Sequence, residues 1–121
     1  MTEADKRKQS RTRSLNLLAY ECLDENQDVV RQGMGRTLDV SEDGLLLETH
    51  APIDVQHTIF LKIGLEDDMA EICGRVVYSR AGESGRYESG IEFDRFDRNN
   101  EAALQILKIY IKAFFQQRKD R

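Results

Sequence analysis

Three residues near the middle of the chain have types and spacing that suit a nucleotide. Asp39, Ser41 and Gly44 form a D-x-S-x-x-G pattern between two strand-like runs. An aspartate carboxylate accepts hydrogen bonds from the N–H and amino groups of a guanine edge, and a serine hydroxyl donates to a phosphate. Glycine supplies a positive φ at the entry to a strand. The same pattern is also typical of an Asx-type turn that starts a strand, so both interpretations stay open.

A second set of chemically suitable residues lies upstream of this turn. Arg7 and Arg11 form an R-x-x-x-R pair, with Arg13 close by. The planar guanidinium binds phosphate, or the O6 and N7 edge of guanine, through two hydrogen bonds, and it also stacks on a base. Residues 1–13 contain almost no apolar side chains, which predicts a flexible basic arm. A solvated terminus without any ligand is the alternative interpretation.

Length and charge restrict the partners of the chain. With 121 residues, of which 40% are hydrophobic, the chain is long enough for one domain with one core. The formal net charge of −4 disfavours a long nucleic acid, whereas a local cluster of arginines suits a small anion. No apolar run is long enough for a membrane span, and the N-terminus is too polar for a secretory signal. We therefore expect a cytoplasmic domain.

The residues that most often perform catalysis or bind metals show no informative spacing. Cys22 and Cys73 lie far apart, which predicts free buried thiols in a reducing compartment. His50 and His57 have no spacing that would complete a zinc site. No nucleophile stands in a recognisable pattern with a base. We expect a binding protein that is not an enzyme and uses no metal or cofactor.

Apolar and polar residues alternate along most of the chain, which indicates β-strands. We therefore expect strands to position the two motifs. A change of phase between Leu17 and Leu18 predicts a bulge or bend in the first strand. Further along, the alternation places Val76 and Tyr78 on the same face of one strand. Because the runs are joined by short turns, they predict an antiparallel all-β fold, either a closed barrel or a sandwich. The predicted strands cover residues 14–22, 29–40, 45–49, 57–65, 71–79 and 87–93.

The apolar spacing becomes helical after Phe96, which predicts an amphipathic C-terminal helix within residues 98–121. Asp97, Asn99 or Asn100 can cap its start. A stripe this wide requires burial, so the helix either covers the barrel or forms a surface for a partner or a second copy of the chain. The apolar residues at helical spacing are Leu104, Leu107, Ile111, Phe114 and Phe115.

The order of these features along the chain resembles the PilZ domain family. A basic arm, an acidic turn, a late strand with the sequence G-I-E-F and a closing helix follow one another over nearly the whole chain. The hallmark of the family is R-x-x-x-R followed, after one pair of strands, by D/N-x-S-x-x-G. Arg7 and Arg11 match the first element, and Asp39, Ser41 and Gly44 match the second.

This resemblance implies a six-stranded antiparallel β-barrel with a C-terminal helix that binds cyclic di-GMP, a bacterial second messenger. In such domains the two arginines, here Arg7 and Arg11, clamp guanine and phosphate, while the turn residues line the side of the barrel. The resemblance also makes Gly90, in the G-I-E-F run, and the extra cation Arg13 candidate contacts of the ligand. The expected activity is that of a receptor that switches a partner protein in motility or biofilm regulation. The sequence does not identify that partner.

Two other binding functions fit the same barrel. It can serve as an adaptor between proteins without any ligand, or it can bind a single-stranded nucleic acid through aromatic side chains and a basic groove. The negative net charge and the small number of aromatic residues disfavour the second function. We expect one domain overall, made of an arm (1–13), a barrel (14–97) and a helix (98–121), which is either a monomer or a homodimer.

Overall fold

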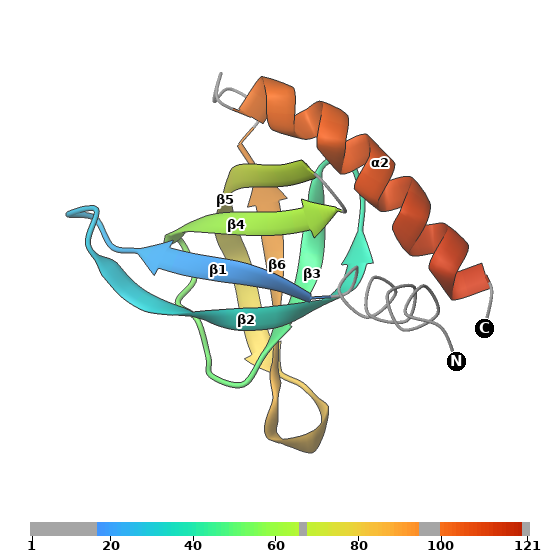
Figure 1. Cartoon of the computed structure of the whole chain (residues 1–121). Helices are drawn as coiled ribbons and strands as arrows, with labels where there is room; N and C mark the ends of the chain where they lie inside the picture. Colours follow the sequence, from blue (N-terminus) through green and yellow to red (C-terminus); the bar gives the residue numbers. More distant parts are fainter. Residues whose placement is uncertain (1–16, 66–67, 95–99, 120–121) are drawn as a thin grey trace, which may run out of the picture.

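Six strands form a closed antiparallel barrel in the order β1-β2-β3-β6-β5-β4, followed by a C-terminal helix (Figure 1). The computed structural model describes residues 17–65, 68–94 and 100–119. The architecture confirms the predicted six-stranded barrel with a closing helix. The elements are β1 (Leu17–Leu23), β2 (Val29–Val40), β3 (Gly44–Thr49), β4 (Thr58–Leu65), β5 (Asp68–Ala81), the short 3-10 helix η1 (Glu83–Gly85), β6 (Tyr87–Phe93) and α2 (Asn100–Lys119).

The alternating runs form strands because each buries one face inside the barrel. Ile59, Leu61 and Ile63 of β4 are fully buried, and the residues between them face outward. Closure gives every strand a neighbour on both sides, so the backbone groups of the barrel pair with one another. Asp24 fixes the turn between β1 and β2, since its carboxylate accepts hydrogen bonds from the N–H groups of Asn26 (2.8 Å) and Asp28 (3.0 Å).

The predicted bulge near the start of β1 is wrong. Leu17 and Leu18 pair with consecutive residues of β2, and the register shifts instead between Cys22 and Leu23. Leu17 is simply an outward-facing leucine at the start of the described strand, with 44% of its surface exposed. The phase of apolar residues therefore misled the prediction, because an exposed leucine looks the same in a sequence as an inward-facing one. The first part of the predicted strand, residues 14–16, lies outside the described residues.

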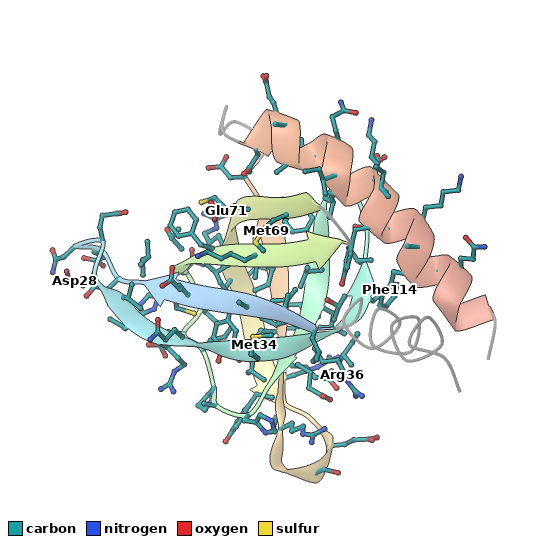
Figure 2. All side chains as sticks on the ribbon, viewed as in Figure 1. Asp28, Met34, Arg36, Met69, Glu71 and Phe114 are labelled. Atoms are coloured by element: carbon teal, nitrogen blue, oxygen red, sulfur yellow. The ribbon has the colours of Figure 1, made fainter. Side chains whose placement is uncertain are left out.

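Helix α2 covers the barrel, which is one of the two roles that its apolar stripe predicted. It lies against the side of the barrel at which β2 and β4 end (Figure 1). The side chains of Ala103, Leu107, Tyr110 and Phe114 join the barrel core, and Figure 2 shows Phe114 between the helix and the end of β2. Burying each of the large apolar side chains stabilises the fold by on the order of 2 kcal/mol. Within the described residues, no helix is both long and apolar enough to cross a lipid bilayer.

The start of α2 is held to the barrel by Asn100, one of the predicted capping residues. Its carboxamide oxygen accepts a hydrogen bond from the N–H of Cys73 (3.1 Å), and its nitrogen donates to the carbonyl oxygens of Asp94 (2.6 Å) and Cys73 (3.3 Å). The side chain is 2% exposed. Asn100 therefore ties the helix to β5 and to the end of β6, where the sequence had predicted a cap of the helix itself. The other two candidates, Asp97 and Asn99, lie outside the described residues.

Candidate functional site

The D-x-S-x-x-G residues form the turn between β2 and β3, and hydrogen bonds of Ser41 close this turn. The N–H of Ser41 donates to the carbonyl oxygen of Gly44 (2.8 Å), and Ser41 Oγ lies 3.4 Å from the same oxygen. Ser41 Oγ also accepts a hydrogen bond from the N–H of Asp43 (3.3 Å). Just before the turn, the Asp39 carboxylate accepts one from the N–H of Val40 (3.0 Å). Short-range side-chain hydrogen bonds thus fix the shape of the turn, as the residue types predicted.

Gly44 is required for a reason other than the predicted one. It does not adopt a positive φ. A Cβ atom at this position would lie 2.0 Å from the carbonyl oxygen of Ile91 in the neighbouring strand β6. Because that obstacle is backbone, a side chain could be accommodated only if the two strands moved apart. Glycine therefore lets β6 approach the end of the turn closely.

A β-bulge in β2 turns Asp39 out of the barrel. The register between β2 and β3 shifts between Thr37 and Asp39, so Leu38 is the extra residue. Thr37 is buried inside the barrel at 3% exposure, whereas Asp39 is exposed on its outside. An inserted residue reverses the in-and-out alternation, and this reversal presents the aspartate to solvent.

A second bulge, in β5, turns Tyr78 out of the barrel. Here the register with β6 shifts between Val76 and Tyr78, which makes Val77 the extra residue. Val76 is fully buried, but 42% of the surface of Tyr78 is exposed. The prediction that these two residues share a face is therefore wrong, because the bulge inverts the alternation between them.

The two bulges align four outward-facing residues across neighbouring strands. Asp39 of β2 is paired with Leu46 of β3, Leu46 with Gly90 of β6, and Gly90 with Tyr78 of β5. We call these four residues the outer row. The row crosses three strand-to-strand spacings, so it is about 14 Å long.

Gly90 and Tyr78 form a flat platform at one end of the outer row. A Cβ atom on Gly90 would lie 2.2 Å from Cε2 and 2.7 Å from Cδ2 of Tyr78, so the tyrosine ring lies directly over the glycine. The guanidinium carbon of Arg80 is 5.5 Å from the centre of the same ring. An aromatic ring and a guanidinium plane are both surfaces on which a base can stack.

Ion pairs fix the charged side chains that border the outer row on one side. Arg36 of β2 lies 3.2 Å from Glu48 of β3, which also lies 3.4 Å from Arg86. Arg80 of β5 lies 3.1 Å from Glu88 of β6. These pairs hold the guanidinium groups close to the surface of the barrel, which limits the freedom of the arginine next to the platform.

The outer row and the turn line one shallow pocket of about 340 Å³ on the outside of the barrel. Four of the predicted site residues meet in it, namely Asp39, Ser41, Gly44 and Gly90. Tyr78 lines the same pocket and was missed by sequence reasoning. Its signal was the glycine opposite it, since a glycine in a strand indicates the close approach of another group. Arg7, Arg11 and Arg13 lie outside the described residues.

A larger cavity of about 720 Å³ adjoins this pocket and shares Asp43 and Glu92 with it. Among the described residues, its charged lining consists of these two residues, Asp94 and Arg75. Arg75 lies 3.4 Å from Glu92, which offsets its charge locally. Carboxylates outnumber cations among the described lining residues of both pockets, so charge does not distinguish the two.

Of the two thiols that were predicted to be buried, that of Cys22 is buried and that of Cys73 is half-buried. Cys22 is 1% exposed, and burial raises the pKa of its thiol from 9.0 to about 11. The thiol therefore stays protonated and is a poor nucleophile at neutral pH. His57 Nδ1 lies 3.9 Å from a carboxylate oxygen of Asp54 near the start of β4. Within the described parts of the chain, no three histidine, cysteine or acidic residues are grouped so that they could hold a metal ion.

Comparison with sequence models of protein families matches the PilZ domain over residues 5–108. The chain belongs to the PilZ domain family. The match includes both motifs, the outer row and the first part of α2. PilZ domains are ligand-binding receptors for cyclic di-GMP, and this family membership agrees with the resemblance that the sequence motifs indicated.

Solved PilZ structures share the fold of this chain. The PilZ domain of CeSA from a cellulose-synthesizing bacterium has a TM-score of 0.55 and 16% identity, covering 79% of this chain and 93% of the other. K. pneumonia MrkH in its apo state gives the same TM-score and identity, with coverage of 86% and 49%, so this PilZ chain spans about half of MrkH. At such low identity the likeness shows the fold alone. No curated protein sequence matches this chain significantly.

Proposed function

We propose that this PilZ domain is a receptor that binds cyclic di-GMP on the outer row and then acts on a partner protein. The alignment of Asp39 and Tyr78 on the outside of the barrel, either side of Leu46 and Gly90, carries the proposal. Two bulges are needed to produce this alignment. Both of the turned-out side chains line the pocket that contains the motif turn.

Each part of the pocket suits one part of the ligand. The Asp39 carboxylate can accept hydrogen bonds from the N–H and amino group of one guanine. The ring of Tyr78 offers a surface on which a purine stacks, and the guanidinium carbon of Arg80 lies 5.5 Å from the centre of that ring. The length of about 14 Å between the ends of the outer row leaves room for a dinucleotide along it.

The arginines of the R-x-x-x-R motif complete the site in this proposal. Leu17, the first residue of β1, pairs with Arg36, which lies about 10 Å along β2 from Asp39. Arg11 precedes Leu17 by six positions, and such a segment spans up to about 20 Å. Arg11, and Arg7 beyond it, are thus close enough in sequence to reach the pocket. Both guanidinium groups then bind the phosphates or the guanine edges of the ligand.

Binding would act on a partner by changing which conformations of the domain are populated. The ligand favours the state in which the arm arginines and the outer row contact it together. The surface around the pocket differs between this state and the others. The amount of a partner bound would therefore change with the concentration of cyclic di-GMP, if the partner binds one state more tightly.

The alternative function is a protein adaptor that needs no ligand. An apolar groove of about 370 Å³ on β1, β2 and β4 favours it, because exposed apolar surface of this kind often binds other proteins. Ala19, Met34 and Phe60 line the groove, and Met34 is 57% exposed (Figure 2). In the closed barrel, β1 and β4 are the two strands that take no part in the outer row. An adaptor using this groove would be indifferent to cyclic di-GMP.

A calorimetric titration of the purified protein with cyclic di-GMP tests the proposal. We expect micromolar or tighter binding, which corresponds to about −8 kcal/mol or below. Asp39→Ala should lose the preference for cyclic di-GMP over cyclic di-AMP, because the carboxylate is proposed to read the guanine edge. Absence of heat from a protein shown to be folded by circular dichroism would refute the receptor function and favour the adaptor.

The contribution of the arm is tested by removing one guanidinium at a time. Arg7→Ala and Arg11→Ala should each weaken binding by about 2–4 kcal/mol, the loss typical of a charge-assisted contact. Arg31→Ala is the matched control, because it removes the same charge from an exposed residue of β2 next to the hairpin turn. If all three variants bind as the parent protein does, the arginines of the arm take no part in the site.

A further inference from the structure

Helix α2 is tied to the strand that leads into the motif turn by one buried hydrogen bond. The hydroxyl of Tyr110 donates to Thr37 Oγ1 at 2.9 Å, and the two residues are 0% and 3% exposed. Burial raises the pKa of Tyr110, so its hydroxyl keeps the proton that it donates. Thr37 is the last residue before the bulge that turns Asp39 outward. This hydrogen bond therefore attaches the helix to β2 close to Asp39.

A second tie connects the start of α2 with the other side of the same turn. Asn100 bonds to the backbone of Cys73 and Asp94, and the N–H of Asp94 donates to the carbonyl oxygen of Cys73 (3.0 Å). Next to them, the N–H of Phe93 donates to the carbonyl oxygen of Asp43 at 2.9 Å. The motif turn is thus linked to α2 through β2 on one side and through the end of β6 on the other.

We propose that Tyr110 is a positioning residue for the ligand site, and that α2 holds Asp39 and the turn in the geometry that binds cyclic di-GMP. The proposal rests on the function proposed above. If the helix moved away, the hydroxyl of Thr37 would lose its buried hydrogen bond to Tyr110. The bulge at Leu38 therefore keeps its shape while α2 is docked. Because coupling between two equilibria is reciprocal, ligand binding also stabilises the docked helix.

Two variants separate positioning from simple loss of stability. Tyr110→Phe removes one hydroxyl and leaves Thr37 buried without that partner. The double variant Thr37→Val/Tyr110→Phe replaces both polar groups with apolar groups of similar shape, which keeps the stability close to that of the parent protein. Tyr20→Phe is the matched control. It removes a hydroxyl from another tyrosine in the core, at 5% exposure, on strand β1.

The first readout needs no ligand. Amide hydrogen exchange of the free protein should be faster at Ser41 and Asp43 in the double variant than in the parent protein, while Tyr20→Phe should leave these amides unchanged. Their hydrogen bonds lie within the turn itself, so they report its local opening. Equal exchange at the turn in the double variant and the parent protein would overturn the positioning role, whether or not the domain binds cyclic di-GMP.

The second readout is a calorimetric titration with cyclic di-GMP. The double variant should bind about fivefold more weakly than the parent protein. When the same two substitutions are added to the Asp39→Ala variant, they should not weaken binding further. In the parent protein, the ligand should slow exchange of the α2 amides. Failure of the parent protein to bind would refute the receptor function. Binding by the parent with equal affinity in the double variant would refute the role of Tyr110 alone.

Discussion

At the scale of single residues, the proposed site depends on side chains whose direction is set by one extra residue nearby. Val77 decides that Tyr78 faces solvent, as Leu38 does for Asp39. Alternation of apolar and polar residues indicates strands, but it does not show where an extra residue reverses the pattern. The motif identified Asp39 in spite of its bulge, whereas Tyr78 belongs to no motif and was placed on the same face as Val76.

Replacing Tyr78 tests the stacking platform. Tyr78→Ala should weaken the binding of cyclic di-GMP by about 2 kcal/mol, the usual contribution of an aromatic ring stacked on a base. Tyr78→Phe should bind nearly as well as the parent protein, because it keeps the ring and loses only the hydroxyl. Calorimetric titration of both variants measures the difference. If Tyr78 contributed through its hydroxyl, both variants would instead lose the same binding affinity.

Gly44 shows how a motif can require a glycine for a physical reason other than the expected one. The motif identified it, and a positive φ was the expected explanation. In the structure its backbone is not in the left-handed region, and the carbonyl of Ile91 fills the space of a side chain. That carbonyl belongs to β6, which is distant in sequence. A requirement created by another strand is not visible in the local sequence.

At the scale of elements, the strands and the helix followed from periodicity, but their mutual contacts did not. The predicted runs agree with β2 to β6 and with α2 to within a few residues. Asn100 was expected to cap the helix, and it instead bonds to Cys73 and Asp94. This assignment depends on which strand lies beside the start of the helix, and a single sequence does not contain that information.

The contact between β5 and β6 gives a prediction about Gly90. A methyl group there would collide with the ring of Tyr78, so Gly90→Ala should push the ring out of place and weaken cyclic di-GMP binding. Gly64→Ala is the matched control, because a Cβ atom at Gly64 meets nothing within 4 Å. We expect binding affinity to fall by about 1–2 kcal/mol for the first variant and to stay unchanged for the second.

A double-mutant cycle identifies the cause of that loss. If Gly90→Ala acts by displacing the ring, it should have little further effect in a Tyr78→Ala background, where no ring remains to be displaced. Fully additive losses in calorimetric titrations would show that Gly90 acts independently of Tyr78, for example through direct contact of its backbone with the ligand.

At the scale of the whole molecule, the closed barrel brings together residues that are far apart in the sequence. Because β3 pairs with β6, the hairpin of β2 and β3 lies beside that of β5 and β6, which places Asp39 and Tyr78 in one row. Helix α2 contacts both hairpins through Thr37 and Cys73. In a chain with an overall charge of −4, positive charge is concentrated in the N-terminal segment of the sequence, where Arg7 and Arg11 lie.

The most direct test of the proposed site is a titration of the labelled protein with cyclic di-GMP, followed by backbone amide NMR. We expect the largest chemical-shift changes in the turn from Asp39 to Gly44 and at Tyr78 and Gly90. The amides of Ala19 and Phe60, in the groove formed by the other strands, should change little. Changes centred on that groove, or unchanged spectra at saturating ligand, would contradict a cyclic di-GMP site on the outer row.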